Sequence, residues 1–152
     1  FSDSGAGFGL VEHQCPRAGQ SMLSIDSARD FLELTKVKMA SQSTGLLMVG
    51  GGVPKNFAQD ITVAAELLVG EAEMHKYAIQ ITVADERDGG LSGSTLQEAH
   101  SWGKVETANE QMVFSEATLA FPLIAGYGYH QGSWKGRPER RFQAMLAEEQ
   151  AK

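Results

Sequence analysis

Residues 44–54 read TGLLMVGGGVP, a short apolar run followed by three glycines and a proline. The run 44–49 is nearly all apolar and bounded by glycine, the pattern of a parallel strand buried on both faces. Pro54 suits the first turn of a helix that we expect to reach about Leu68. Strand, glycine turn and helix together predict an open α/β sheet whose turn is either structural or brings backbone N–H groups close to a dinucleotide. Five apolar residues of the helix are expected to face the core: Phe57, Ile61, Ala64, Ala65 and Leu68.

The same alternation continues on both sides of this stretch. A helix capped by Ser24 or Asp26 is expected to run to about Ala40. Runs 77–83 and 111–115 have the composition of further strands. At least three alternations of strand and helix predict an α/β, Rossmann-like fold, in which a mostly parallel sheet has helices on both faces.

The two ends of the chain differ in composition from the centre. Residues 1–9 carry three glycines and two serines, which predicts a loop. Residues 117–129 form an apolar helix that Pro122 is expected to kink or to start late. Glycines and a proline after Gln131 then predict a linker, followed by a mixed-charge helix over 138–152. We therefore predict a catalytic domain over 1–130 and a linker with a C-terminal helix over 131–152.

Composition limits the classes of function. The 152 residues are 42% hydrophobic and 21% charged, as in a single soluble domain. No apolar run approaches the roughly eighteen residues that cross a bilayer, so we expect a cytoplasmic protein without membrane contact. A net charge of -6 argues against nucleic acid as the main partner. Cys15 has no cysteine partner, and the four histidines lack the spacing of metal ligands, so no metal site is expected.

Residues 98–104, EAHSWGK, form the candidate site. In a helix, Glu98 and Trp102 share a face, and Gly103 ends the helix so that Lys104 turns toward that face. Lysine attacks a carbonyl or imine carbon only as the neutral amine, which the dry wall of Trp102 favours and the carboxylate of Glu98 opposes unless a cationic substrate occupies it. The alternative is a structural helix end, where Glu98 completes a capping box with Thr95 and Lys104 complements the helix dipole.

Two acidic positions follow strands. Glu116 comes directly after the strand 111–115, where a carboxylate can bind a ribose hydroxyl. Asp88 lies in an acidic, glycine-rich loop after the strand 77–83, which either contacts a ligand or is simply solvated.

Three motifs in this order, GGGVPK at 50–55, SWGK at 101–104 and EATLAFPL at 116–123, resemble the deoxyhypusine synthase family, in its bacterial, homospermidine-synthase-like branch. The resemblance runs from Phe1 to about Tyr129. It implies that Lys104 carries an aminobutyl group as an imine and that NAD takes and returns a hydride. The residues that it assigns to NAD are Asp3, Gly50, Gly51, Gly52 and Glu116, and those that it assigns to the polyamine are Glu98 and Trp102. Asp88, from its place in the acidic loop, is the third candidate for the polyamine.

The resemblance also implies a reaction and partners. The enzyme would pass the aminobutyl group from a polyamine to an acceptor amine, forming homospermidine or a related polyamine. Deoxyhypusine-forming members have acids where this chain has Phe8 and Leu91, and a histidine in place of Asn56. The alternatives are a deoxyhypusine synthase proper, which acts on a protein lysine, and a non-catalytic nucleotide-binding or assembly module. We expect this chain to be the C-terminal half of a longer enzyme, by cleavage or as part of a split protein, which pairs with its N-terminal half and forms a homo-oligomer, a tetramer.

Overall fold

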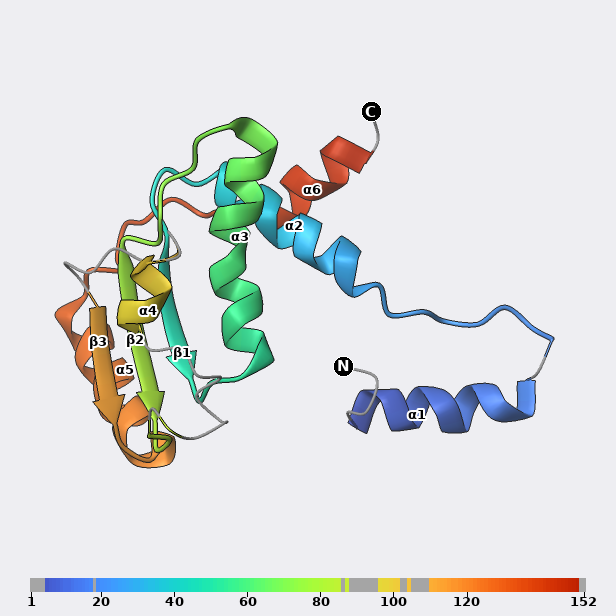
Figure 1. Ribbon diagram of the computed structural model, residues 1–152, viewed down its shortest axis with the longest axis horizontal. Helices are drawn as coiled ribbons and strands as arrows, with labels where there is room; N and C mark the ends of the chain where they lie inside the picture. The colour runs from blue at the N-terminus through green and yellow to red at the C-terminus, as the bar shows by residue number, and fades with distance from the viewer. Residues whose placement is uncertain are drawn as a thin grey trace. The chain divides into compact units, whose positions relative to one another are not determined.

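The computed structural model describes residues 5–17, 19–85, 87, 96–101, 104 and 110–150 (Figure 1). The chain divides into two compact units, Phe1–Asp30 and Phe31–Lys152. The elements follow in the order α1 (Gly5–Gln14), η1 (Cys15–Arg17), α2 (Ser27–Met39), β1 (Gly45–Val49), α3 (Val53–Val69), β2 (Tyr77–Thr82), α4 (Leu96–Ser101), β3 (Glu110–Phe114), α5 (Ala117–Gln131) and α6 (Phe142–Gln150). None of the helices among these residues is long and apolar enough to cross a membrane.

The first unit corrects one prediction. The loop expected over residues 1–9 is wrong from Gly5 onward, because Gly5 begins α1. Glycine destabilises a helix interior by about 1 kcal/mol relative to alanine, which is why the composition indicated a loop. The helix formers Ala6, Leu10 and Glu12 alternate with these glycines and continue the helix to Gln14.

The helix α2 begins where the sequence indicated. The Asp26 carboxylate accepts a hydrogen bond from the backbone N–H of Arg29 at 3.0 Å, and this bond satisfies one of the unpaired donors at the helix start. Of the two caps predicted, Asp26 is therefore the one used.

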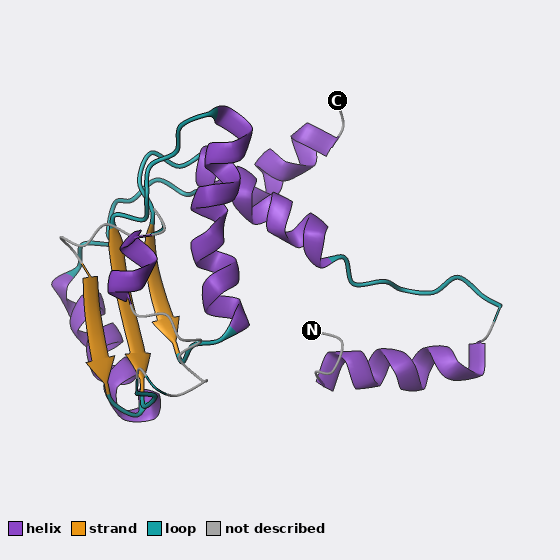
Figure 2. Ribbon diagram, in the orientation of Figure 1, coloured by secondary structure: helices purple, strands orange, loops and turns teal. Residues whose placement is uncertain are grey.

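Three strands form a parallel sheet in the order β1-β2-β3 (Figure 2). Gly45 lies opposite Tyr77, and Ala78 lies opposite Glu110. Each crossover between neighbouring strands contains a helix, as parallel pairing requires. The predicted α/β fold with a parallel sheet is confirmed.

The two faces of the sheet are covered by different helices. On one face Met48 and Ala78 pack with Leu96 of α4, and the Gln59 amide of α3 contacts the Met48 sulfur at 3.8 Å. Ile81 points to the opposite face, where α5 contacts β2. Figure 1 shows α4 in front of the sheet and α5 behind it, so helices cover both faces as predicted.

The buried face of α3 is more polar than predicted. Ile61 and Ala65 are buried as expected. The prediction that Leu68 faces the core is wrong, because 58% of its surface is exposed. At about 1.5 Å per residue the 17-residue helix outruns the five-residue strand β1, so its last turn has no strand to pack against. The remaining buried positions of α3 are polar: Lys55, Gln59 and Thr62.

The helix α5 starts before Pro122, so the late start allowed by the sequence does not occur. Glu116 caps it by accepting from the Thr118 N–H at 2.9 Å, and Gly132 ends it in the left-handed conformation. The last helix, α6, begins at Phe142 and not at Pro138 as predicted.

Candidate functional site

The glycine turn is open on one side. Gly50 has a φ of 81°, its N–H donates to the Ile81 carbonyl at 2.8 Å, and its carbonyl accepts from the Gln80 side chain at 2.9 Å. A Cβ built on Gly50 would meet no atom within 4 Å. Gly50 and Gly51 line a hollow of about 250 Å³ between β1 and α3. The turn is therefore rigidly held and still leaves room for a ligand to approach the backbone.

Gln80 adds a buried acceptor beside this turn. Its side chain is fully buried, and its amide nitrogen is used by the Gly50 carbonyl. Among the residues that the structure describes, its side-chain oxygen has no hydrogen-bond partner. An acceptor buried in this way costs free energy until a donor reaches it, so it favours a donor group near the glycine turn.

Glu116 lies at the same edge of the sheet, directly after β3. Its carboxylate also accepts from the Thr118 hydroxyl, and this bond is the main reason why the pKa of Glu116 is lowered. Because β2 lies between β1 and β3, two strand spacings of about 5 Å each separate the glycine turn from Glu116 at the carboxyl edge of the sheet. The acid thus has the capping role shown here and remains ionised for a ligand.

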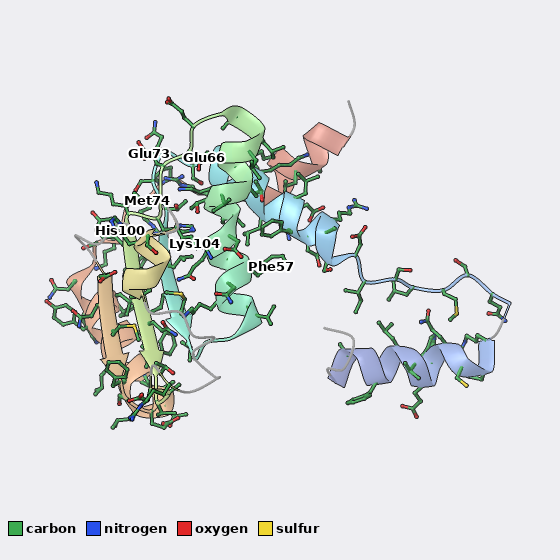
Figure 3. The ribbon with its side chains drawn as sticks, viewed as in Figure 1. Phe57, Glu66, Glu73, Met74, His100 and Lys104 are labelled. Carbon is green, nitrogen blue, oxygen red and sulfur yellow. The ribbon has the colours of Figure 1, made fainter. Side chains whose placement is uncertain are left out.

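Lys104 lies beside α3, away from the glycine turn (Figure 3). Its Nζ is 2.5 Å from Oδ1 of Asp60, and its side chain is only 17% exposed. Its backbone carbonyl accepts from the N–H of His75 at 3.0 Å. The lysine is thereby held at both its backbone and its amine.

This ion pair lines an open, largely apolar hollow of about 390 Å³ at the surface. Its walls are Phe31 of α2, which packs edge-on against Phe57 at 5.0 Å, and three residues of α3. Its full lining is Phe31, Asp60, Val63, Ala64, Leu67 and Lys104. A cavity with apolar walls and one acid suits a ligand that alternates methylene segments with ammonium groups.

Only some of the predicted site residues are among those that the structure describes. Asp3, Asp88 and Trp102 lie outside the described residues, and of Glu98 only its place in α4 is described. The helix carrying Glu98 extends to Ser101, close to the end expected from Gly103. The roles of all these residues remain predictions.

Sequence reasoning missed Asp60. Asp60 is the acid nearest to Lys104 among the described side chains. The sequence had indicated Glu98 as the acid beside this lysine. A signal was present, because Asp60 interrupts an apolar helical stripe that runs from Phe57 through Ala64 to Leu67. A single carboxylate on an apolar helix face is costly to bury unless a cationic group pairs with it, so its presence predicts such a partner.

Comparison with known proteins decides the family. The family model for deoxyhypusine synthase matches residues 1–127. The chain belongs to the deoxyhypusine synthase family. A deoxyhypusine synthase-like protein of Chlorobaculum parvum is 66% identical over 96% of this chain and 42% of its own length. One from Elusimicrobium minutum is 59% identical over the whole chain and 40% of its own length. A probable deoxyhypusine synthase 2 of Methanosarcina mazei is 45% identical over 82% and 36%, respectively.

This member of the deoxyhypusine synthase family spans about two fifths of the length of these curated relatives. Two separate parts of the candidate site lie on it, the glycine turn at one end of α3 and the Lys104 hollow further along the same helix. Asp60 follows Gly52 by about 12 Å of helix, and no described contact joins the two parts.

Proposed function

We propose that the complete protein transfers an aminobutyl group from a polyamine to an acceptor amine through an imine on Lys104. The observation that carries this proposal is the Lys104–Asp60 pair in its apolar hollow, within a chain of the deoxyhypusine synthase family. A lysine amine that is shielded from water and lies beside a carboxylate can replace the departing amine nitrogen on the substrate carbon, and the acceptor nitrogen can replace it in turn.

The proposed reaction balances as two transfers. The glycine turn and Glu116 would hold NAD, which would supply hydride removal from the carbon next to the secondary nitrogen of the polyamine and the later return of that hydride. Neutral Lys104 attacks the C=N carbon, the bond to the departing amine breaks, and that amine leaves with a proton. The acceptor amine then attacks the same carbon and displaces Nζ, and the returned hydride reduces the new C=N bond.

Asp60 has a defined part in this scheme. In the absence of substrate its carboxylate forms an ion pair with the Lys104 amine. A polyamine ammonium that binds Asp60 replaces Lys104 as the ion-pair partner. Its methylene segments then lie against Phe31, Val63 and Leu67. Substrate binding therefore releases the Lys104 amine from its ion pair with Asp60.

The residues present fit NAD as the hydride carrier. The space beside Gly50 and the carboxylate of Glu116, whose pKa is lowered, offer room and an acceptor along one edge of the sheet. Ribose hydroxyls are donors of the kind that a carboxylate binds. Gly50, Gly51, Gly52 and Glu116 would hold the cofactor, together with Asp3 by family resemblance.

The acceptor that we propose is a small diamine, so that the product is homospermidine or a related polyamine. Phe8, Asn56 and Leu91 replace groups that in deoxyhypusine-forming members bind charged nitrogens. Hydrogen bonds to charged groups are worth about 1.5–3 kcal/mol each, so losing them disfavours a long, highly charged ligand more than a short one. A protein lysine as acceptor is the alternative within the same chemistry.

The test is borohydride trapping in the presence of spermidine and NAD, read by intact mass and peptide mapping. We expect one aminobutyl adduct on Lys104 in the protein and none in Lys104→Ala. The absence of any adduct would favour the rival class, a non-catalytic nucleotide-binding or assembly module. Competition between putrescine and the unmodified precursor of the hypusine-bearing translation factor, whose acceptor lysine is free, then separates the two acceptors, and labelling of the precursor without homospermidine would overturn the diamine proposal.

A further inference from the structure

A buried polar chain lies behind Lys104 and joins four separate segments. Lys38 at the end of α2 donates to the Thr44 hydroxyl at 2.7 Å. The Thr44 oxygen is 2.9 Å from Nδ1 of His75, and Nε2 of His75 is 3.1 Å from the carbonyl of Ala58 in α3. Lys38 and His75 are buried. No step of the proposed reaction uses this chain.

The partners fix the direction of every bond. The Ala58 carbonyl only accepts, so Nε2 of His75 carries the hydrogen. Nδ1 of a neutral imidazole is then an acceptor, and the Thr44 hydroxyl must donate to it. Lys38 has donors only, and it supplies the hydrogen that the Thr44 oxygen accepts. The neutral tautomer of His75 with its hydrogen on Nε2 therefore satisfies all three hydrogen bonds, from Lys38 through Thr44 and His75 to Ala58.

His75 also holds the lysine. Its backbone N–H donates to the carbonyl of Lys104 at 3.0 Å. Its side chain contacts Ala58, which lies two residues before Asp60 on α3. His75 therefore fixes both the backbone that carries the Lys104 amine and the helix that carries its carboxylate partner. A change in its tautomer or ring position alters the geometry of the Lys104–Asp60 pair.

We infer that His75, oriented by Lys38 and Thr44, is a positioning residue that sets the distance between the Lys104 amine and Asp60. The inference rests on the proposed function of Lys104. The buried ammonium of Lys38 also donates to the Met74 carbonyl at 3.4 Å, so it contacts the residue directly before His75 as well as Thr44.

The test compares two threonines in the complete protein. Thr44→Val removes the hydroxyl from the chain and keeps its shape, whereas Thr44→Ser keeps the hydroxyl. Thr62→Val is the control, since Thr62 is a buried threonine that donates to the Gln59 carbonyl within α3, whereas Thr44 is half-buried. We expect Thr44→Val to lower kcat about tenfold with KM changed less than about twofold, and Thr44→Ser to restore kcat. Thr62→Val should leave kcat within about twofold of wild type.

A second readout does not depend on activity. Hydrogen exchange of the peptide that contains the His75 amide should accelerate about tenfold in Thr44→Val and remain unchanged in Thr62→Val. Lys38→Met serves as the second variant if Thr44→Val does not fold, with the same expectation. Equal effects of Thr44→Val and Thr62→Val on both readouts would overturn the inference. A protein that forms no Lys104 adduct would instead refute the proposed function, while the exchange result would still decide whether this chain of bonds holds Lys104.

Discussion

The amine of Lys104 forms an ion pair with the carboxylate of Asp60 at 2.5 Å, and the proposed reaction needs this amine to leave the ion pair. Two other buried groups, Lys38 and His75, lie behind it and are joined through Thr44. At the scale of single residues, the site therefore consists of charged and polar groups that are largely shielded from water. Substitution of these groups should change both the rate of turnover and the free energy of unfolding.

Lys104→Ala should abolish trapping and turnover while the fold and NAD binding persist. Asp60 is 42% exposed, so loss of the ion pair should cost no more than about 1 kcal/mol of stability. Lys104→Arg should fail equally, because arginine stays protonated and cannot form an imine. Thermal denaturation and kinetics of the three proteins check this. Product formation at a near wild-type rate by either variant would refute the role of Lys104.

His75 should make stability depend on pH in the acid range. Burial and the charge of Lys38 lower its pKa from 6.5 to about 4. Between these values the unfolded chain binds a proton that the folded chain does not, so the free energy of unfolding should fall as pH drops from 6.5 to 4. The total loss is about 3 kcal/mol.

Urea denaturation at pH 7 and pH 4.5 measures this dependence. His75→Gln keeps a donor for the Ala58 carbonyl and removes the titrating group, so the variant should lose less stability over the same range. Identical pH dependence in both proteins would show that His75 does not contribute.

At the scale of elements, local patterns predicted the strands and most helices. The apolar run before Gly50 and the Asp26 cap are short-range signals, and β1 and α2 formed where they indicated. The failures have other causes. In α1 the low helix propensity of the glycines is opposed by the helix-forming residues between and after them. The exposure of Leu68 at the end of α3 depends on the length of β1, which is distant in sequence.

The candidate site was predictable to the same extent. Lys104 and the glycine turn come from motifs contiguous in sequence, so the sequence could indicate them. Asp60 and His75 are separated from Lys104 by about thirty residues or more, and only the folded chain shows that they meet.

Gly52 should be the most sensitive glycine of the turn. Its φ of 81° and ψ of −155° define a conformation that only glycine adopts readily. Gly52→Ala should therefore destabilise the protein by about 1–3 kcal/mol and weaken NAD binding. Gly126→Ala in α5 is the control, because that position has open space and lies in a helix, where alanine should stabilise by about 0.5–1 kcal/mol. Equal melting temperatures for the two variants would contradict the assignment.

At the scale of the whole molecule, apolar surface remains uncovered. On the α5 side of the edge strand β1, Leu47 is 50% and Val49 56% exposed, and no residue of α5 is buried. Exposed apolar surface of this extent marks an interaction site. Since the chain spans about two fifths of its relatives' length, we propose that the complementary part of the protein covers the β1 face and that further copies complete a homo-oligomer, a tetramer.

Residues 1–152 expressed alone should bind NAD poorly, turn over nothing and self-associate. Addition of the complementary segment in trans should restore activity, because it completes the cofactor pocket and covers the β1 face. Light scattering and the trapping assay measure both effects. A fully active, monomeric 152-residue protein would show that this chain needs no such partner.

The register of the sheet also determines how the chain must fold. Gly45 pairs with Tyr77 and Ala78 with Glu110, a spacing of 32 residues in both cases. Neither strand pair can start from a hairpin, so each requires closure of a long loop before any ladder bond forms. We therefore expect helices α2 and α3 to form early and the sheet to form in the rate-limiting step, on a scale of about milliseconds to seconds. During that interval the edge of β1 is open to other chains, so the yield of refolded protein should fall as its concentration rises.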